Sequence, residues 1–208
     1  MRGQRRKNKA NKLRASPIVN LKKDILSCTK CGLARTRRHV IFGEGNEQAP
    51  IMVIGEAPGR DEDKQGRPFV GRSGQLFNKI CDACGFTRRN HLFISNIVKC
   101  RPPDNRAPTR QETEACLPWL VRQIELIDPK MLILLGATAL RTMAGPNYRI
   151  TRVRGSWLSV CNRPAMPVYH PAALLRNPAL KRETWEDYKQ IVFTYRDLID
   201  PHHYSAHV

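Results

Sequence analysis

The stretch that decides the fold is "IMVIG", residues 51–55, and an acidic stretch, "EAPGRDED", follows it at residues 56–63. The apolar residues of 51–55 are consecutive instead of alternating with polar ones, which is typical of a strand covered on both faces. Three later runs are similarly rich in apolar and β-branched residues, and the sequence therefore predicts four buried strands. The later runs are "LFISNIV" (92–98), "MLILLG" (131–136) and "MPVYH" (166–170).

Helical patterns separate these strands. Residues 73–86 place their apolar side chains on one stripe that ends at a glycine. "TRQE" at 109–112 has the spacing of a capping box and opens a helix that Pro118 is expected to kink or restart. Two more helical patterns lie at 137–145 and 182–199. Strands that alternate with helices predict parallel crossovers in a three-layer α/β domain.

Polar side chains stand at the ends of three of the four strands. Glu56 follows the first strand, Asn96 lies near the end of the second, and His170 closes the fourth. In open α/β sheets the working groups gather at the carboxyl ends of the strands. We therefore expect these three side chains to meet at one rim of the sheet.

The charge balance points to a polyanionic partner. The 208 residues include 36 lysines and arginines against 18 acids, a formal net charge of +18. Such a surplus attracts nucleic acid by releasing condensed counterions, although a plain basic surface or a ribosomal association would give the same numbers.

The chain begins with a strongly basic segment. "MRGQRRKNKANKLRAS" has no acid and no apolar stretch of the kind found in secretory signals, and a mitochondrial presequence is the weaker alternative. We expect residues 1–20 to form a disordered basic arm. No apolar run approaches the ~20 residues of a membrane span, so no membrane partner is expected.

Seven cysteines, an odd number, favour a reducing compartment, where thiols serve as metal ligands or core residues more often than as disulfides. Cys28 and Cys31 form "CTKC", and Cys81 and Cys84 form "CDAC". Either spacing lets two thiolates bind one metal centre. The second pair, however, continues the apolar stripe of its helix, so we interpret it as part of the core.

The first pair needs two further ligands. Cys100 in "VKCRPP" and Cys116 in "EACLPWL" are the candidates, and they leave Cys161 over. Four thiolates without a histidine suit either structural zinc or an iron–sulfur cluster, and their spacing does not choose between the two.

Several segments together resemble the family 4 uracil-DNA glycosylases, the iron–sulfur branch of the uracil-DNA glycosylase superfamily. The resemblance covers about residues 27 to 195 and excludes the basic arm and the tail "DPHHYSAHV" (200–208). The segments that carry it, besides Cys116, are "CTKCGLARTR", "FGEGN", "GEAPGRDEDKQGRPFVGRSGQ", "NIVKCRPPDNR" and "HPAALLRNP".

This resemblance implies a glycosylase domain over residues 21–199, an α/β/α sandwich around a four-stranded parallel sheet. It implies a base-excision repair enzyme that hydrolyses the bond between uracil and deoxyribose in DNA and leaves an abasic site. Such an enzyme is expected to be a cytoplasmic, nucleoid-associated prokaryotic monomer. It also implies one [4Fe–4S] cluster with a structural role, held by Cys28, Cys31, Cys100 and Cys116.

The resemblance also assigns a base pocket. The backbone at Gly55, Ala57 and Gly59 is expected to approach the flipped nucleotide closely. Phe69 is expected to stack on the base, and Asn96 to present donor and acceptor atoms to the uracil edge.

A second set of residues is expected to act on the leaving base and the DNA. His170 is expected to donate a hydrogen bond to the developing uracil anion. Leu174 or Leu175 would fill the space vacated by the flipped base, and Arg176 would contact phosphate.

The acids that follow the first strand are expected where a cation develops. Glu56 is the preferred residue to activate water and to favour a cationic sugar. Glu62 is the alternative, either as the water-activating group or as a support for the loop. Asp61 and Asp63 are expected to cap the next segment or to pair with nearby arginines, Arg60 and Arg67.

Two other classes of function fit part of the pattern. A non-catalytic iron–sulfur module that binds nucleic acid would explain the charge and the cysteines, and a zinc-stabilised nuclease would explain the acids. Some relatives trap DNA covalently with a histidine before the last cluster cysteine, but residues 101–115 contain none. Hydrolysis by water is therefore the expected reaction.

Overall fold

The structure, a computed structural model, describes residues 16–208. The first 15 residues of the predicted basic arm lie outside this range. Helix α1 (Pro17–Leu26) begins within the last residues of that predicted arm and buries Ile18, Leu21 and Ile25. The folded domain therefore begins before residue 21, because this helix has an apolar stripe to bury.

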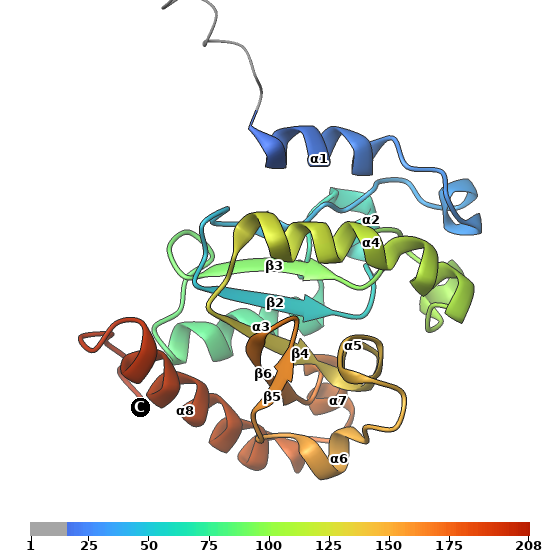
Figure 1. The fold of residues 1–208 in the computed structure, drawn as a ribbon. Coiled ribbons are helices and arrows are strands. Elements are labelled where there is room, and N and C mark those ends of the chain that lie inside the picture. The colour runs from blue at the N-terminus through green and yellow to red at the C-terminus, as the bar shows by residue number, and fades with distance from the viewer. Residues whose placement is uncertain (1–15) are drawn as a thin grey trace, which may run out of the picture.

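One six-stranded sheet forms the centre of the molecule, in the order β1-β3-β2-β4-β6-β5 (Figure 1). The four inner strands are parallel, and they correspond to the four predicted runs. The two outer strands pair antiparallel at the edges. The strands are β1 (Glu44–Gly45), β2 (Ile51–Gly55), β3 (Leu92–Asn96), β4 (Met131–Leu135), β5 (Leu158–Val160) and β6 (Arg163–Val168).

The expected number of four strands was therefore wrong, because the sheet has one further strand at each edge. Strand β1 has only two residues, both half-buried, and β5 has three, of which Ser159 is exposed. Neither segment has the run of apolar residues that marks a strand covered on both faces.

Helices cover both faces of the sheet, as the predicted three layers require. Along β2, Met52 and Ile54 join the core beneath α1, α4 (Arg110–Ile127) and α5 (Gly136–Ala144). Ile51 and Val53 join the opposite core, beneath α3 (Arg72–Ala83) and α8 (Leu180–Leu198). Both faces of the strand are buried, so its residues are all apolar. The shorter helices are η1 (Gly32–Arg35), α2 (Arg60–Gln65), η2 (Pro103–Asn105), α6 (Ile150–Val153) and α7 (Pro171–Arg176).

Two predicted helix ends are confirmed and one expectation changes. Thr109 and Glu112 form the capping box at the start of α4. The α3 helix is followed by Gly85, whose φ of +76° lies in the left-handed region that glycine adopts readily. Helix α4 continues through Pro118 as one helix of 18 residues, so the proline does not restart it.

The C-terminal tail, residues 200–208, packs against the end of α3. The Ser205 hydroxyl donates a hydrogen bond to the Ala83 carbonyl oxygen at 2.8 Å, and the His203 ring lies 2.8 Å from the Cys84 carbonyl oxygen.

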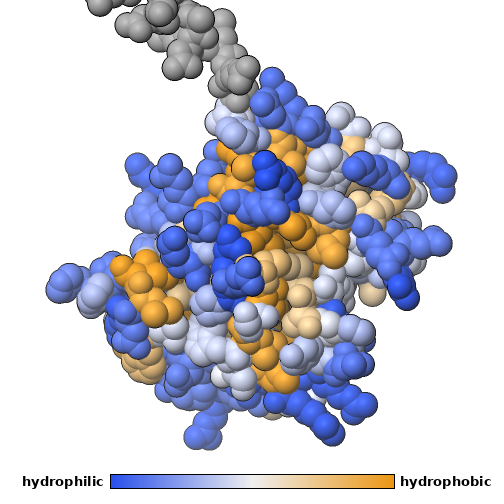
Figure 2. All heavy atoms as spheres, in the orientation of Figure 1, coloured by the Kyte–Doolittle hydropathy of each residue, from blue (hydrophilic) through white to orange (hydrophobic). Residues whose placement is uncertain are grey.

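Hydrophilic side chains cover much of the face in Figure 2, with hydrophobic groups exposed between them. Across residues 16–208, no helix combines the length and the apolar character needed to cross a membrane.

Candidate active site and cysteine centre

A cavity of about 600 Å³ opens at the carboxyl ends of the parallel strands. Its walls come from the segments that follow β2, β3, β4 and β6, and from helix α7. The rim expected from the strand ends is therefore where the polar groups meet. The predicted site residues that line it are Glu56, Ala57, Gly59, Glu62, Phe69, Asn96, His170 and Arg176.

Gly55 supports this cavity from behind its wall. It pairs with Asn96 in the parallel register of β2 and β3. A Cβ atom added at Gly55 would lie 2.4 Å from the Asn96 Oδ1 atom and 2.8 Å from the Phe69 Cζ atom. Glycine is required here because the amide and the aromatic ring occupy the space of a side chain.

Phe69 presents its ring to the cavity from an unusual backbone conformation. Its φ is +55°, in the left-handed region, and its side chain is buried. The ring centroid lies 5.2 Å from that of Phe77 and 5.9 Å from that of His170. The ring is therefore fixed between the α3 core and the residue that precedes α7.

Asn96 is a buried amide with an unused acceptor. Its side chain is 3% exposed, and its Oδ1 atom has no hydrogen-bond partner within the described part of the chain. Leaving a buried acceptor unpaired costs about 1–3 kcal/mol, so folded proteins rarely retain one without a reason. A ligand that donates a hydrogen bond in this cavity would satisfy it.

His170 is held as a neutral ring. Its Nδ1 atom accepts a hydrogen bond of 3.1 Å from the Ala172 backbone N–H, at the start of α7. Burial, and secondarily the charge of Arg176, lower the pKa of His170 to about 4. A neutral imidazole that accepts at Nδ1 carries its proton on Nε2, and this atom is then a donor.

Glu56 directly follows β2, and a threonine orients its carboxylate. The Thr138 hydroxyl donates a short hydrogen bond to Glu56 Oε2, and both residues line the cavity. Thr138 belongs to α5, after β4. No sequence pattern singles out Thr138, because a threonine near the start of a helix has many ordinary uses.

Glu62 was expected either to activate water or to support its loop. In the structure its carboxylate is bound to the backbone of that loop. Its carboxylate accepts hydrogen bonds from the backbone N–H groups of Gly59 at 3.1 Å, Val70 at 3.0 Å and Gly71 at 2.9 Å. The side chain is 8% exposed. Three N–H groups occupy most of its acceptor positions, which favours the supporting role.

The two aspartates have different partners, and only Asp61 pairs with a predicted arginine. Asp63 is buried and accepts from the backbone N–H groups of Arg38 at 2.9 Å and His39 at 3.2 Å. It ties α2 to an earlier loop instead of pairing with an arginine. Asp61 pairs with Arg60 at 3.7 Å as expected, although this exposed contact has little energetic value. The expected pairing of either aspartate with Arg67 was wrong, since Arg67 binds Glu44.

Helix α7 separates the two candidate wedge residues. Leu174 is 1% exposed and Leu175 is 45% exposed. A buried leucine cannot enter DNA, so the structure leaves only Leu175 for that role and corrects the inclusion of Leu174. Arg176, the last residue of α7, lines the cavity.

The four candidate ligand cysteines come together around one small pocket. Cys28 and Cys31 lie in the segment after α1, Cys100 follows β3, and Cys116 belongs to α4. None of them forms a disulfide. Three separate segments of the chain thus bring their four thiols to one pocket, as the sequence predicts.

Hydrogen-bond donors point at three of these sulfur atoms. The Trp119 indole N–H donates to Cys28 Sγ at 3.3 Å, and Arg37 donates to Cys100 Sγ at 3.2 Å. The Lys99 backbone N–H donates to Cys116 Sγ at 3.4 Å. Donors of this kind stabilise thiolates, the form in which cysteine binds metal.

The four cysteines line one pocket instead of converging on a single point. Within residues 16–208, no three or more Cys, His, Asp or Glu side chains converge tightly enough to hold one metal ion. In a four-iron cluster each cysteine binds a different iron atom, so the sulfurs stand farther apart. Four thiols around one shared pocket are therefore a donor set compatible with such a cluster.

The second cysteine pair is confirmed as core. Cys81 and Cys84 are buried among the residues beneath α3 and α8. Burial raises the pKa of the Cys84 thiol to about 12 and that of Cys81 well above its usual range. Both lie in the apolar core and outside the pocket that the other four cysteines line, so they serve packing.

The fold and the cavity define a class: an α/β protein with a cavity of about 600 Å³ at the carboxyl rim of the parallel strands. The model of the uracil DNA glycosylase superfamily matches residues 42–189. The chain belongs to this superfamily, and the resemblance seen in its sequence motifs is confirmed.

Several similar proteins are named type-4 uracil-DNA glycosylase. The chain is 45% identical over 169 residues to the type-4 uracil-DNA glycosylase of Thermotoga maritima, covering 78% of this chain and 86% of that protein. It is 42% identical over 182 residues to that of Sulfurisphaera tokodaii, covering 84% and 83%. The type-4 enzyme of Archaeoglobus fulgidus is 41% identical over 182 residues, covering 84% and 91%.

Proposed function

We propose that this protein is a uracil-DNA glycosylase of base-excision repair, which hydrolyses the N-glycosidic bond of deoxyuridine in DNA. The products are free uracil and an abasic site. The observation that carries the proposal is the unpaired Oδ1 atom of Asn96 in a cavity shared with Phe69, His170 and Glu56. The names of the type-4 relatives support the same activity.

The pocket selects uracil through hydrogen-bond polarity. The uracil N3–H group donates to Asn96 Oδ1 while the base stacks on Phe69. Cytosine presents an unprotonated N3 at the same position, so an acceptor would face an acceptor. Rejection follows because both buried polar atoms would lose their hydrogen bonds.

His170 stabilises the departing base. As the bond between C1′ and N1 breaks, its electron pair passes to N1 and is shared with the uracil oxygens. The neutral ring donates from Nε2 to this developing charge, without giving up its proton. Gly59 and its neighbours supply the close backbone wall.

Glu56 acts at the sugar. Its carboxylate, oriented by the Thr138 hydroxyl, favours the cationic sugar and accepts a proton from the attacking water. The water oxygen then forms the new bond to C1′. Glu62 holds the loop that carries Phe69 and takes no proton.

The four-cysteine site supports this machinery from outside the pocket. Cys28, Cys31, Cys100 and Cys116 would hold one [4Fe–4S] cluster, whose contribution when bound is to cross-link three segments of the chain. Cys100 follows β3 closely after Asn96, so the site braces the strand end that presents the amide.

DNA is the partner of the basic surface. Leu175, exposed on α7, fills the space of the flipped nucleotide, and Arg176 contacts phosphate beside the cavity. Phosphate contacts make the affinity fall steeply with salt. We propose that the enzyme works as a monomer in the cytoplasm of a prokaryotic cell, at the nucleoid, where its substrate lies.

Incubation with uracil-containing DNA tests the proposal. Single-stranded DNA and a U·G duplex are treated with the protein in a metal chelator, and abasic sites are then cleaved with alkali. We expect cleavage at uracil alone, and none in matched strands with cytosine or thymine there. No product from the wild-type protein would refute the glycosylase, and dependence on divalent metal with direct strand breaks would favour a nuclease.

A further inference from the structure

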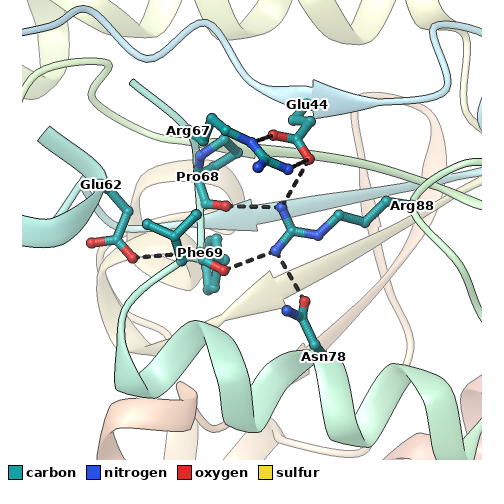
Figure 3. Close-up of polar contacts among 8 residues, drawn as sticks. Glu44, Glu62, Arg67, Pro68, Phe69, Asn78 and Arg88 are labelled. Atoms are coloured by element: carbon teal, nitrogen blue, oxygen red, sulfur yellow. Dashed lines mark hydrogen bonds and ion pairs between the residues drawn. The ribbon is translucent and has the colours of Figure 1, made fainter. Parts of the chain in front are cut away.

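The backbone around Phe69 is held from two sides (Figure 3). On one side, Glu62 accepts from the N–H groups of Val70 and Gly71. On the other side, the Arg88 guanidinium donates to the carbonyl oxygen of Pro68 at 2.9 Å and to that of Phe69 at 2.9 Å. An anion thus binds the donors of this loop and a cation binds its acceptors.

This loop needs such support because of its conformation. Phe69 has a φ of +55°, which a bulky residue adopts only when its surroundings impose it. Helix α3 presses directly on the same backbone: a Cβ atom added at Gly74 would lie 2.1 Å from the Phe69 carbonyl carbon. A small rotation of the loop would move the ring relative to Asn96.

Arg88 is itself fixed by two partners. It donates to Asn78 Oδ1 on α3 at 3.0 Å, and it lies 3.4 Å from the carboxylate of Glu44 on the edge strand β1. Glu44 also accepts two hydrogen bonds from Arg67, at 2.7 and 2.8 Å. The hydrogen bond from Arg67, aided by the charge of Arg88, holds the pKa of Glu44 below its usual range.

Arg88 does not line the 600 Å³ cavity, so it cannot touch a base bound there. It precedes β3, at the end of the sheet opposite the cavity, and reaches the loop from behind with a largely buried side chain. Any influence on the base must therefore pass through the Phe69 backbone.

We propose that Arg88 is a positioning residue for base recognition, acting through the Phe69 loop with Glu44 and Asn78 as its supports. The proposal rests on the uracil-DNA glycosylase function. The two hydrogen bonds from Arg88 to the carbonyl oxygens of Pro68 and Phe69 form a clamp on this loop. The clamp sets the distance between the Phe69 ring and the Asn96 amide, and so sets the fit of a pyrimidine between them. Base stacking exists before and during bond cleavage, so loss of the clamp weakens binding more than it slows the bound complex.

A double-mutant cycle tests this. Arg88→Met, Phe69→Ala and the double variant are compared in single-turnover kinetics on a single-stranded uracil oligonucleotide. The half-saturating enzyme concentration, the maximal rate and inhibition by free uracil are measured. Arg88→Lys, which keeps a donor for one carbonyl, should restore part of the loss. Arg89→Met is the matched control, because Arg89 is exposed in the same turn and no described residue is its partner.

We expect Arg88→Met to raise the half-saturating concentration and the uracil inhibition constant about tenfold, with a maximal rate within about threefold. In the Phe69→Ala background the same change should cost less than about twofold. Equal costs in both backgrounds, or a lower maximal rate at unchanged half-saturation, would overturn the proposal and indicate a general loss of structure.

Asn78→Ala gives a second route if Arg88→Met folds poorly, because it removes one support of Arg88 and no hydrogen bond to the loop. It should raise the uracil inhibition constant in the same direction. An unchanged constant in both variants, with an active wild-type enzyme, refutes the clamp alone. An inactive wild-type enzyme refutes the glycosylase function instead.

Discussion

Asn96 of the base pocket and Cys100 of the four-cysteine site lie at the two ends of residues 96–100, yet the two sites are built in opposite ways. The pocket leaves a polar atom, Asn96 Oδ1, without a partner among the described residues, which costs stability and keeps the atom free for a ligand. The cysteine site gathers four thiols and aims N–H donors at three of them, and a bound cluster would take all four as ligands. The base pocket is suited to a ligand that binds and leaves, whereas the four-cysteine site would hold a permanent cofactor.

Lys99 joins the two regions. Its buried ammonium donates to the Asn96 carbonyl oxygen at 2.9 Å and to the Gln123 side chain at 2.6 Å, while its backbone N–H donates to Cys116 Sγ. The strand end that presents Asn96 is thus tied to the cysteine site. Changes in the cysteine site should therefore damage folding, whereas changes to pocket groups left free for the base, such as Asn96, should damage the reaction and spare folding.

The largest effect is expected from Cys100→Ser. Loss of one of four ligands should abolish the brown colour and the absorbance near ~400 nm of a cluster protein. The folding free energy supplied by the cluster should be lost with it. Cys161→Ser, at an exposed position, is the control and should keep both colour and melting temperature. A colourless, zinc-containing wild-type protein would contradict the cluster itself.

Glu56→Gln should act on the reaction alone. Removing the carboxylate that takes the proton from water should slow single-turnover cleavage by about 100- to 10,000-fold, at an unchanged melting temperature. Glu62→Gln should do the reverse, lowering stability by about 1–3 kcal/mol because one carboxylate oxygen becomes an NH2 group and at least one of the three backbone N–H groups loses its acceptor. Full activity of Glu56→Gln would transfer the catalytic role to another group.

His170→Ala should slow cleavage by about 100-fold through loss of the Nε2–H donor. Because the folded pKa of about 4 lies below the usual value near 6.5, the unfolded chain alone binds a proton between these values. Stability of the wild-type protein should therefore fall as the pH drops from 6.5 toward 4, and His170→Ala should lose that part of the dependence.

Ring ¹⁵N spectra of the wild-type protein provide a direct check. They should show a neutral Nε2–H ring for His170 from pH 7 down to about 4. A titration midpoint near 6.5 would contradict the neutral donor. His202→Ala, at an exposed tail position, should leave the cleavage rate unchanged.

The parallel centre of the fold and the main pocket residues could be predicted from the sequence, because both follow from local order. A consecutive apolar run indicates a buried strand, and the residues after such strands, Glu56, Asn96 and His170, must share a rim. The four candidate ligand cysteines were predicted from their sequence contexts and from the family resemblance, and the structure brings all four to one pocket.

The missed features depend on contacts between distant segments. Strand β1 is two residues long, so nothing local marks Glu44 as a partner of Arg88, 44 residues later. Thr138 is bound to Glu56 across 82 residues. Leu174 and Leu175 are equally apolar, and only the docking of α7 decides which one is buried. Patterns of a few residues carry no record of such packing.

The smallest and most discriminating effect is expected from Asn96→Ala. If the pocket trades stability for binding, removing the unpaired Oδ1 atom should leave the free energy of unfolding unchanged or raise it. Uracil cleavage should nevertheless fall at least about tenfold, since one hydrogen bond to the base is lost. Urea unfolding and single-turnover kinetics measure the two quantities on one preparation. A clear loss of stability would mean that Asn96 serves the fold, like the residues of the cysteine site, and the contrast between the two regions would disappear.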